Sequence, residues 1–331
     1  MKLLFIFTGG TIGSTLCGDV ISTDSTKSYK IIDEYKKRYG MDFEYDTEQP
    51  YTELSENNTG AHIRALCACV KENAKRGYDG IIITHGTDTL QYTAAAVGYS
   101  LGLDSVPVCI VSSNRPIEDE RANGLENLRG AVLFIKDGCG RGAFVVYRNG
   151  NSDIMRVHRA ARLIGAKAYS DDVSSVFSQV YGHFEGEHFV KNESYRESPD
   201  MMPPLDMMPL TDDSESIGML TPYPGMRYPD DLCGLKYIIA NTFHSGTLNT
   251  KSDKARAFFK KANEAGVTVF AAGTYGGANY ESAEEYGELF INTLNNISPV
   301  AVYIKLWALD CMGLDPKKYM NISLSGDIMP K

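Results

Sequence analysis

The sequence has no basic segment and no long apolar run. It carries a net charge of −9 over 331 residues, and an acidic surface attracts neither nucleic acid nor an anionic membrane. No uncharged apolar stretch has the length that is needed to span a bilayer. We therefore expect no nucleic-acid partner and no membrane partner.

The sequence also lacks a regular cysteine spacing. The seven cysteines are an odd number, and Cys67 and Cys69 are too close together for a zinc pair of the Cys-x-x-Cys type. The chain begins directly with a strand pattern, whereas a secretory signal needs a longer apolar region and a small-residue cleavage site. We therefore expect a reduced, cytoplasmic protein that binds no metal.

What the sequence does contain is an alternation of short apolar runs and helical segments. The runs are rich in Val, Ile and Phe without polar alternation, which is typical of parallel strands buried on both faces. They occupy residues 3–7, 80–84, 106–112, 142–147, 237–241 and 268–272, and helical spacing occupies residues 60–76, 89–100 and 252–265. This order predicts an α/β protein with a doubly wound, mostly parallel sheet.

The alternation stops between residues 185 and 213. Four prolines and four methionines lie there without a helical or strand period, which is typical of a linker. We predict a larger N-terminal domain at residues 1–190, a linker at 191–213 and a smaller C-terminal α/β domain at 214–331.

Two threonines set among glycines follow two of the apolar runs. Thr11 lies in TGGTIGS at residues 8–14, and Thr87 lies in HGTDT at residues 85–89. Open α/β sheets bind ligands where their strands end, so two such hydroxyls, one beside Asp88, suggest nucleophilic chemistry. A phosphate-binding loop and a plain tight turn are alternatives for the first motif, although neither common glycine spacing is present. A helix cap is the alternative for the second.

A threonine nucleophile also needs a base. None of the six histidines has a motif that gives it this role, and His85 suits packing or hydrogen bonding beneath the loop better. A lysine can act as a base when burial and nearby positive charge lower its pKa. Lys167, among small residues in GAKAYSD at 165–171, is the candidate, and a solvated surface lysine is the alternative.

Taken together, these segments resemble the bacterial-type asparaginase/glutaminase family, and in particular its cytosolic type I L-asparaginases. The two threonine motifs are similar to the two signature motifs of the family in order and separation. Supporting segments appear in the same order at residues 54–57 (LSEN), 114–116 (NRP), 167–182 and 223–226 (YPGM). The resemblance implies hydrolysis of L-asparagine, and in some members L-glutamine, through a covalent acyl-enzyme without a cofactor.

The resemblance also implies a role for each matched residue. Thr11 would attack the side-chain amide carbon, and backbone N–H groups near Thr11 and Thr87 would hold the oxyanion. The implied catalytic residues are Thr11, Thr87, Asp88 and Lys167, and the implied substrate-binding residues are Ser55, Glu56, Gly86, Thr87 and Asp88. Of these, Ser55 would bind the substrate α-carboxylate, and Glu56 and Asp88 its α-ammonium group. Family members assemble as dimers or dimers of dimers, so we expect a homodimer or homotetramer.

Three positions depart from the family pattern. Val20 stands where the mobile loop after the first motif usually has a tyrosine, which leaves Tyr29 as the lid candidate. Glu56 replaces the glutamine or serine of many members, and this bears on the choice between asparagine and glutamine. The loop at residues 273–277 also differs, so the resemblance assigns no substrate contact across subunits.

The sequence therefore favours an L-asparaginase over two alternatives. One is a glutaminase-asparaginase or the amidase subunit of a tRNA amidotransferase. We expect the amidotransferase class less, because it carries an additional N-terminal domain and this chain starts at the first strand. The other is an amino-acid-binding module with weak or no hydrolysis, which Val20 in the lid loop allows.

Overall fold

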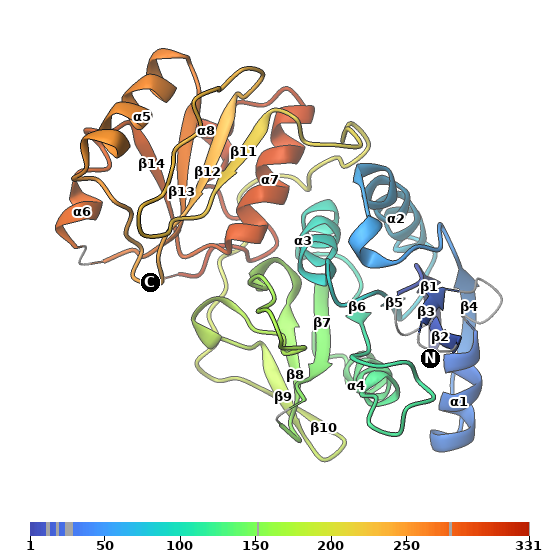
Figure 1. Ribbon diagram of the computed structural model, residues 1–331. Helices are drawn as coiled ribbons and strands as arrows, with labels where there is room; N and C mark the ends of the chain where they lie inside the picture. Colours follow the sequence, from blue (N-terminus) through green and yellow to red (C-terminus); the bar gives the residue numbers. More distant parts are fainter. Residues whose placement is uncertain (11–13, 18–19, 24–28, 151, 278–279, 331) are drawn as a thin grey trace.

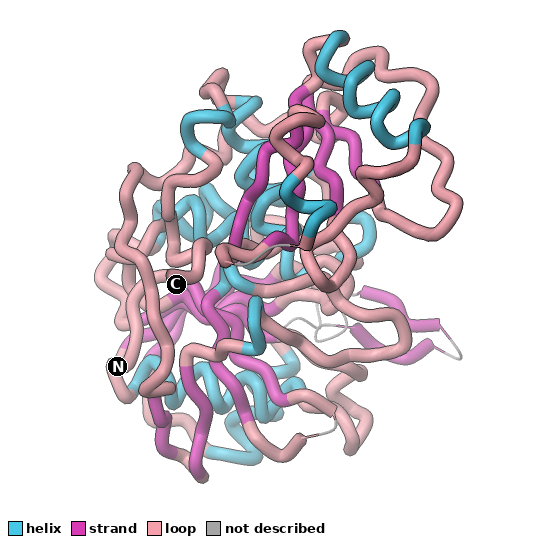
Figure 2. The backbone as a smooth tube through the Cα atoms, turned by 90° about the vertical axis from the view of Figure 1, so that its left-hand side faces the viewer, coloured by secondary structure: helices cyan, strands magenta, loops and turns pink. Residues whose placement is uncertain are grey.

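The computed structural model describes residues 1–10, 14–17, 20–23, 29–150, 152–277 and 280–330. A larger N-terminal and a smaller C-terminal α/β domain are each built on their own sheet (Figure 1). A side view shows the strands of the two domains as separate groups (Figure 2). This confirms the predicted two-domain α/β fold.

The first sheet has eight strands in the order β10-β9-β8-β7-β6-β5-β1-β4. Their bounds are β1 Lys2–Phe7, β4 Glu44–Glu48, β5 Gly80–Thr84, β6 Val108–Val111, β7 Ala143–Arg148, β8 Met155–Arg159, β9 Gly182–Glu185 and β10 His188–Lys191. From β4 to β7 all pairs are parallel, and from β7 to β10 they are antiparallel. Phe7 pairs with Thr84, so the loops that follow β1 and β5 leave the sheet side by side at its carboxyl edge.

Four helices cover the first sheet. α1 (Lys30–Tyr39) and α4 (Gly124–Lys136) pack on one face, and α2 (Gly60–Asn73) and α3 (Leu90–Leu101) pack on the other. After β1 the chain forms a hairpin from β2 (Ser14–Cys17) and β3 (Val20–Thr23). Short 3₁₀ turns lie at η2 (Ser55–Asn57), η3 (Ala160–Arg162) and η4 (Val176–Ser178).

The second sheet is parallel throughout, in the order β11-β12-β13-β14. Its elements are β11 Ile217–Leu220, β12 Tyr237–Asn241, α5 Asp253–Glu264, β13 Thr268–Thr274, α6 Glu281–Glu284, β14 Ile291–Asn295, α7 Pro299–Cys311 and α8 Pro316–Tyr319. α5 packs on one face, and α7 packs between the other face and α3. A single apolar core therefore runs from the first sheet through α3 and α7 to the second.

A buried polar cluster joins the end of the chain to the N-terminal domain. Lys305 of α7 forms an ion pair of 2.9 Å with Asp327, and both side chains are fully buried. The hydroxyl of Tyr99, in α3, donates to the same carboxylate at 2.9 Å. Because unpaired buried charge is very costly, this cluster favours one arrangement of the two domains.

Several strands escaped prediction. β4 reads EYDTE and is polar because it lies at the edge of the sheet. β8 carries Arg159, which is buried because Glu197 pairs with it at 2.7 Å and the carbonyl of Arg141 accepts from it at 2.8 Å. The run at 106–112 is also shorter than predicted, since β6 covers only Val108–Val111. Apolar runs thus identified the central strands and missed those at the edge and in the antiparallel extension.

The segment between the two sheets is attached rather than loose. Residues 192–216 contain no helix or strand, whereas the predicted linker began at Lys191, which belongs to β10. Leu205, Met207 and Leu210 are buried, and the N–H of Leu205 donates to the carbonyl of Tyr99 at 2.8 Å. The segment therefore packs along α3 despite its prolines.

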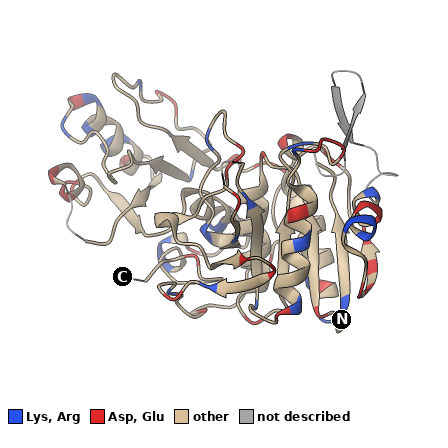
Figure 3. Ribbon diagram, turned by 90° about the horizontal axis from the view of Figure 1, so that it is seen from below, with Lys and Arg blue, Asp and Glu red and all other residues tan. Residues whose placement is uncertain are grey.

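Charged residues of both signs are interspersed over the two domains (Figure 3). Within the described part of the chain, no helix is long and apolar enough to cross a bilayer.

Candidate functional site

A cavity of about 690 Å³ opens at the carboxyl edge of the first sheet. The residues that follow β5 form one side, and a long loop after η3 forms the other. It is lined by Thr87, Asp88, Leu90, Gln91, Leu163, Ile164, residues 166–172 and Val173. We call this space the edge cavity. Two residues of the second threonine motif and Lys167, far apart in the sequence, thus face one space.

The threonine side of the edge cavity is held by close backbone packing. Gly10 and Gly86 follow β1 and β5, and a Cβ on Gly10 would lie 2.4 Å from the backbone nitrogen of Gly86. A Cβ on Gly86 would in turn lie 2.4 Å from Ser55 Oγ. Gly10 also has φ +75°, a conformation that other residues rarely adopt. Glycine is therefore required at both positions, because only glycine allows the three segments to meet.

The LSEN segment is fixed to this side of the site. The hydroxyl of Thr89, just before α3, donates to the carbonyl of Ser55 at 2.8 Å. Ser55 is buried, and its Oγ lies 3.5 Å from Asp88 Oδ2, at the long limit of a hydrogen bond. Glu56, the next residue, is exposed. Thr89 makes no side-chain cap bond to α3, so its hydroxyl holds the Ser55 segment rather than capping the helix.

His85 lies beneath the loop that follows β5, as expected. Its ring is fully buried, with Nδ1 2.8 Å from the carbonyl of Gly86 and Nε2 3.1 Å from Asn58 Nδ2. Burial lowers the pKa of His85 to about 4. The imidazole is therefore neutral at neutral pH, and its bonds orient the backbone before Thr87.

Lys167 lies on the opposite side, in the loop of residues 164–174, which we call the lysine loop. The loop has no regular structure, and its ends meet where Ile164 N donates to the carbonyl of Ser174 at 3.0 Å. The two residues that flank the loop, Leu163 and Ser175, form an isolated antiparallel β-bridge. The side chain of Lys167 is exposed toward the cavity that it lines.

Ser55, Glu56 and Gly86 do not line the edge cavity, although Ser55 and Gly86 pack behind the residues that do. Two further candidates from the sequence are not part of this arrangement. Thr11 and the residues directly after it lie outside the described residues. Tyr29 does not line the edge cavity. Its ring packs edge-on against Phe7, with centroids 5.1 Å apart, and Phe7 belongs to the core beneath α1 and α4. The lid role of Tyr29 therefore has no support from its position.

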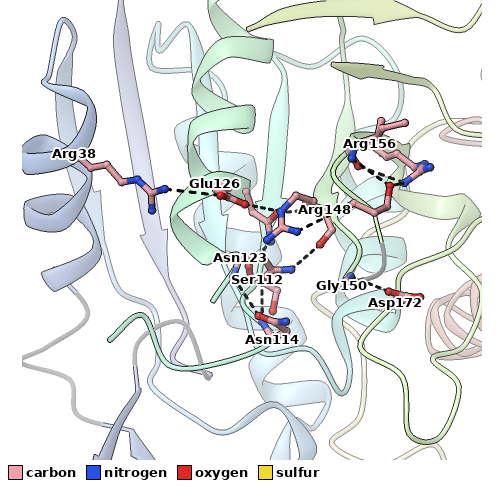
Figure 4. A network of polar contacts seen from close by, with 12 residues as sticks. Arg38, Ser112, Asn114, Asn123, Glu126, Arg148, Gly150, Arg156 and Asp172 are labelled. Carbon is pink, nitrogen blue, oxygen red and sulfur yellow. Dashed lines mark hydrogen bonds and ion pairs between the residues drawn. The ribbon is translucent and has the colours of Figure 1, made fainter. Parts of the chain in front are cut away.

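Sequence reasoning also missed residues that hold the site. Asn58 lies beside His85 and is 3.4 Å from the Thr89 hydroxyl. The side chain of Asn149 forms hydrogen bonds with the backbone of the lysine loop. Asn123 joins Asn114 to the end of β7 (Figure 4). Asparagines in loops are common, so their residue type carried no signal; only the fold shows what they join.

Across the described ranges, no group of three or more His, Cys, Asp or Glu side chains is placed to hold a metal ion.

Residues 2–192 match the family model described as asparaginase, N-terminal. The chain belongs to the asparaginase family. This membership covers more than half of the chain and identifies it as an amide-hydrolysing enzyme.

Curated relatives of this asparaginase-family chain are named as subunits of glutamyl-tRNA(Gln) amidotransferase. The protein from Pyrobaculum aerophilum is 23% identical over 320 residues, covering 93% of this chain and 75% of the relative. The protein from Methanosarcina barkeri is 31% identical over 110 residues, covering 33% of this chain and 26% of the relative. In the second case the chain therefore matches only about a quarter of the relative.

Solved structures of similar fold carry the name L-asparaginase. The thermostable L-asparaginase from Thermococcus kodakarensis has a TM-score of 0.79 at 21% identity, covering 100% of both chains. L-asparaginase I from Vibrio cholerae has a TM-score of 0.75 at 21% identity, covering 99% of both chains. At this identity the likeness shows the fold that the asparaginase-family chain shares with them.

Proposed function

We propose that this chain is an L-asparaginase, which hydrolyses L-asparagine to L-aspartate and ammonia. The observation that carries the proposal is that Thr87, Asp88 and Lys167 line one cavity at the carboxyl edge of the sheet. A hydroxyl next to a base, with a third group that orients the base, is the arrangement that activates such chemistry, and an amine and a carboxylate can fill the last two roles. The names of the structural neighbours support the same substrate.

In the proposed reaction the Thr11 hydroxyl attacks the side-chain amide carbon of the substrate. Thr87, with Lys167 and Asp88, takes up the proton and returns it to the departing nitrogen, which leaves as ammonia. Water then attacks the acyl-threonine, releases L-aspartate and restores the Thr11 hydroxyl. The negative oxygen of each tetrahedral intermediate is stabilised by backbone N–H groups near Thr11 and Thr87.

The substrate is held by its α-carboxylate and α-ammonium groups. Ser55 binds the carboxylate beside the backbone of Gly86, and Asp88 and Glu56 bind the ammonium. Hydrogen bonds with a charged partner are stronger than neutral ones, so these contacts orient the amide as well as binding it. The close packing of Gly10, Gly86 and Ser55 supports this role, because it fixes the binding groups relative to Thr87.

The proposal is tested by ammonia release from L-asparagine, L-glutamine and their D-forms by the purified protein. We expect L-asparagine to be the best substrate, and Thr11→Ala or Thr87→Ala to lose nearly all activity while the circular dichroism spectrum is retained. Most of the wild-type rate in either variant, or no ammonia from any of the four amides, would contradict it.

A second candidate rests on the curated relatives, which are named as parts of an amidotransferase. In this alternative the same cavity releases ammonia from an amide for transfer to another acceptor. Turnover with free L-asparagine in the absence of any partner favours the asparaginase. Ammonia release that requires an added amidotransferase partner favours the amidotransferase role.

We also propose that the chain forms a homodimer or homotetramer and acts in the cytoplasm without a cofactor. Light scattering after size exclusion measures the oligomeric state, and a monomeric mass would contradict the proposed assembly. The independence from a cofactor is tested by assaying activity after dialysis against a metal chelator, in buffer without added cofactor, and we expect the activity to be retained.

A further inference from the structure

The position of Lys167 depends on the lysine loop that carries it. The side chain is exposed, and no described residue forms an ion pair with its ammonium group. Its position therefore depends on the backbone of a loop that has no helix or strand of its own. Any group that fixes this backbone also fixes the lysine relative to Thr87.

One side chain outside the loop makes two hydrogen bonds to it. Asn149 Nδ2 donates to the carbonyl of Val173 at 3.0 Å, and the N–H of Val173 donates to Asn149 Oδ1 at 2.9 Å. The amide thus pairs with both backbone groups of one residue, as a neighbouring strand would. Beside it, Gly150 N donates to Asp172 Oδ1 at 3.0 Å (Figure 4).

Asn149 is itself tied to the threonine side of the cavity. The preceding residue, Arg148, ends β7, and its N–H donates to Asn127 Oδ1 at 2.8 Å. Asn127 Nδ2 donates to the carbonyl of Ser112 at 2.8 Å, and Ser112 Oγ donates to the carbonyl of His85 at 2.7 Å. Short hydrogen bonds thus connect the residue before Gly86 to the residue before Asn149.

We propose that Asn149 is a positioning residue, which sets the place of Lys167 relative to Thr87 without touching the substrate. This inference rests on the proposed function of the edge cavity. Reacting groups must lie within a narrow range of geometries, and a displacement of about 1 Å costs about a hundredfold in rate. A lysine loop released from Asn149 places Lys167 in that geometry less often.

The chemistry requires an asparagine at this position. Its amide supplies one donor and one acceptor to the two groups of Val173, whereas an aspartate of the same shape only accepts. Asn149→Asp also places a second carboxylate beside Asp172. It therefore breaks the pairing without creating a cavity, and Asn149→Ala removes both bonds.

Asn192 provides a matched control. It also joins two backbone segments, since its Nδ2 donates to the carbonyl of Val180 at 3.1 Å and its Oδ1 accepts from the N–H of Ser194 at 3.0 Å. It does not line the edge cavity. Asn192→Asp therefore measures the cost of the same substitution outside the proposed positioning network.

The experiment compares wild type with Asn149→Asp, Asn149→Ala and Asn192→Asp. For both Asn149 variants we expect kcat for L-asparagine to fall about tenfold to a hundredfold, while the Kd for L-aspartate changes less than twofold. Affinity is retained because Asp88 lines the opposite side of the cavity and Ser55 lies next to it, with its Oγ 3.5 Å from the Asp88 carboxylate. Asn192→Asp should keep the wild-type kcat. A kcat within twofold of wild type in both Asn149 variants overturns the proposal, as does an equal loss in Asn192→Asp.

Hydrogen exchange followed by mass spectrometry gives a readout that does not depend on activity. Peptides that cover residues 164–174 should exchange faster in Asn149→Asp, and peptides from α3 should not change. Unchanged exchange in the lysine loop overturns the positioning role even if the variant is inactive. Faster exchange in that loop, together with a wild-type enzyme that releases no ammonia, contradicts the proposed function and leaves the anchoring of the loop supported.

Discussion

The two sides of the edge cavity are built by different means. On the threonine side, a Cβ on Gly10 would lie 2.4 Å from the backbone nitrogen of Gly86, so two backbone segments meet with no room for a side chain between them. On the lysine side, a Cβ on Gly165 would meet nothing within 4 Å. The first side is positioned by the strands of the sheet that precede it. The second side is a loop whose backbone is held in place by a few side-chain hydrogen bonds.

This difference suggests a division of tasks between the two sides. The close packing after β1 and β5 holds the groups that we propose recognise the substrate, and recognition needs a constant geometry. The lysine loop holds Lys167, the proposed proton-transfer group, and the exposure of its side chain leaves it open to substrate and water. The two sides should therefore fail differently when they are altered, the first through binding and folding and the second through rate.

The largest effect is expected from Lys167→Met. Loss of a positioned proton-transfer group typically costs about 10²- to 10⁴-fold in rate, and we expect kcat to fall in this range. The Tm should change little, because Lys167 is exposed. The same change at Lys75, another exposed lysine, should leave kcat unchanged. A Lys167→Met enzyme with a wild-type kcat would remove the lysine side from the mechanism.

The next effect contrasts the two glycines. Gly86→Ala forces Ser55 out of place, and overpacking of this kind costs about 1–3 kcal/mol of stability. We expect a lower Tm and weaker L-aspartate binding. Gly165→Ala has free space and should stay within about 0.5 kcal/mol of wild type. Equal stability of the two variants in urea titrations would show that the sides are packed alike.

A smaller effect is expected when Ser55 is changed alone. A hydrogen bond to a charged group contributes about 1.5–3 kcal/mol, so Ser55→Ala should raise the KM for L-asparagine at least about tenfold. We expect kcat to change less, because the proton-transfer groups remain in place. Ser194→Ala serves as the control. A fall in kcat at unchanged KM would instead assign Ser55 to the chemical step.

The smallest effect concerns pH. Burial lowers the pKa of His85 to about 4 and that of His158 to about 3. In the unfolded chain these groups bind protons near pH 6.5, so stability falls as the pH drops below that value. The slope approaches about 1.4 kcal/mol per pH unit for each group.

His85→Gln should remove about one proton from this dependence, measured as the free energy of unfolding at pH 6 and pH 5. The same pH slope in wild type and variant would mean that His85 is not the buried neutral group described.

Much of the fold was readable from the sequence because its central strands are apolar and parallel. β5 reads GIIIT and β12 reads YIIAN, and both begin and end where predicted. β4 and β8 were missed because one is a polar edge strand and the other buries an arginine against Glu197. The residues of a strand do not reveal a distant partner, such as Glu197, that allows a charged residue of that strand to be buried.

Part of the geometry of the candidate site was also predictable from the sequence. Thr87, Asp88 and Lys167 were proposed together from motifs that resemble a known family, and they line one cavity. Asn149 and Asn58 were not singled out, since each acts through a residue that is distant in sequence. Local patterns identify reactive groups, whereas their supports depend on which loops the fold brings into contact.

The central claim is that the edge cavity is the amide-hydrolysing centre, and Thr87→Val tests it most directly. The measurement combines ammonia release from saturating L-asparagine with calorimetric binding of L-aspartate, for wild type and variant. We predict that wild type releases ammonia and L-aspartate in equal amounts. The variant should bind L-aspartate within about tenfold of wild type and release almost no ammonia, a loss of at least about 10²-fold. Release at the wild-type rate by Thr87→Val would contradict the account.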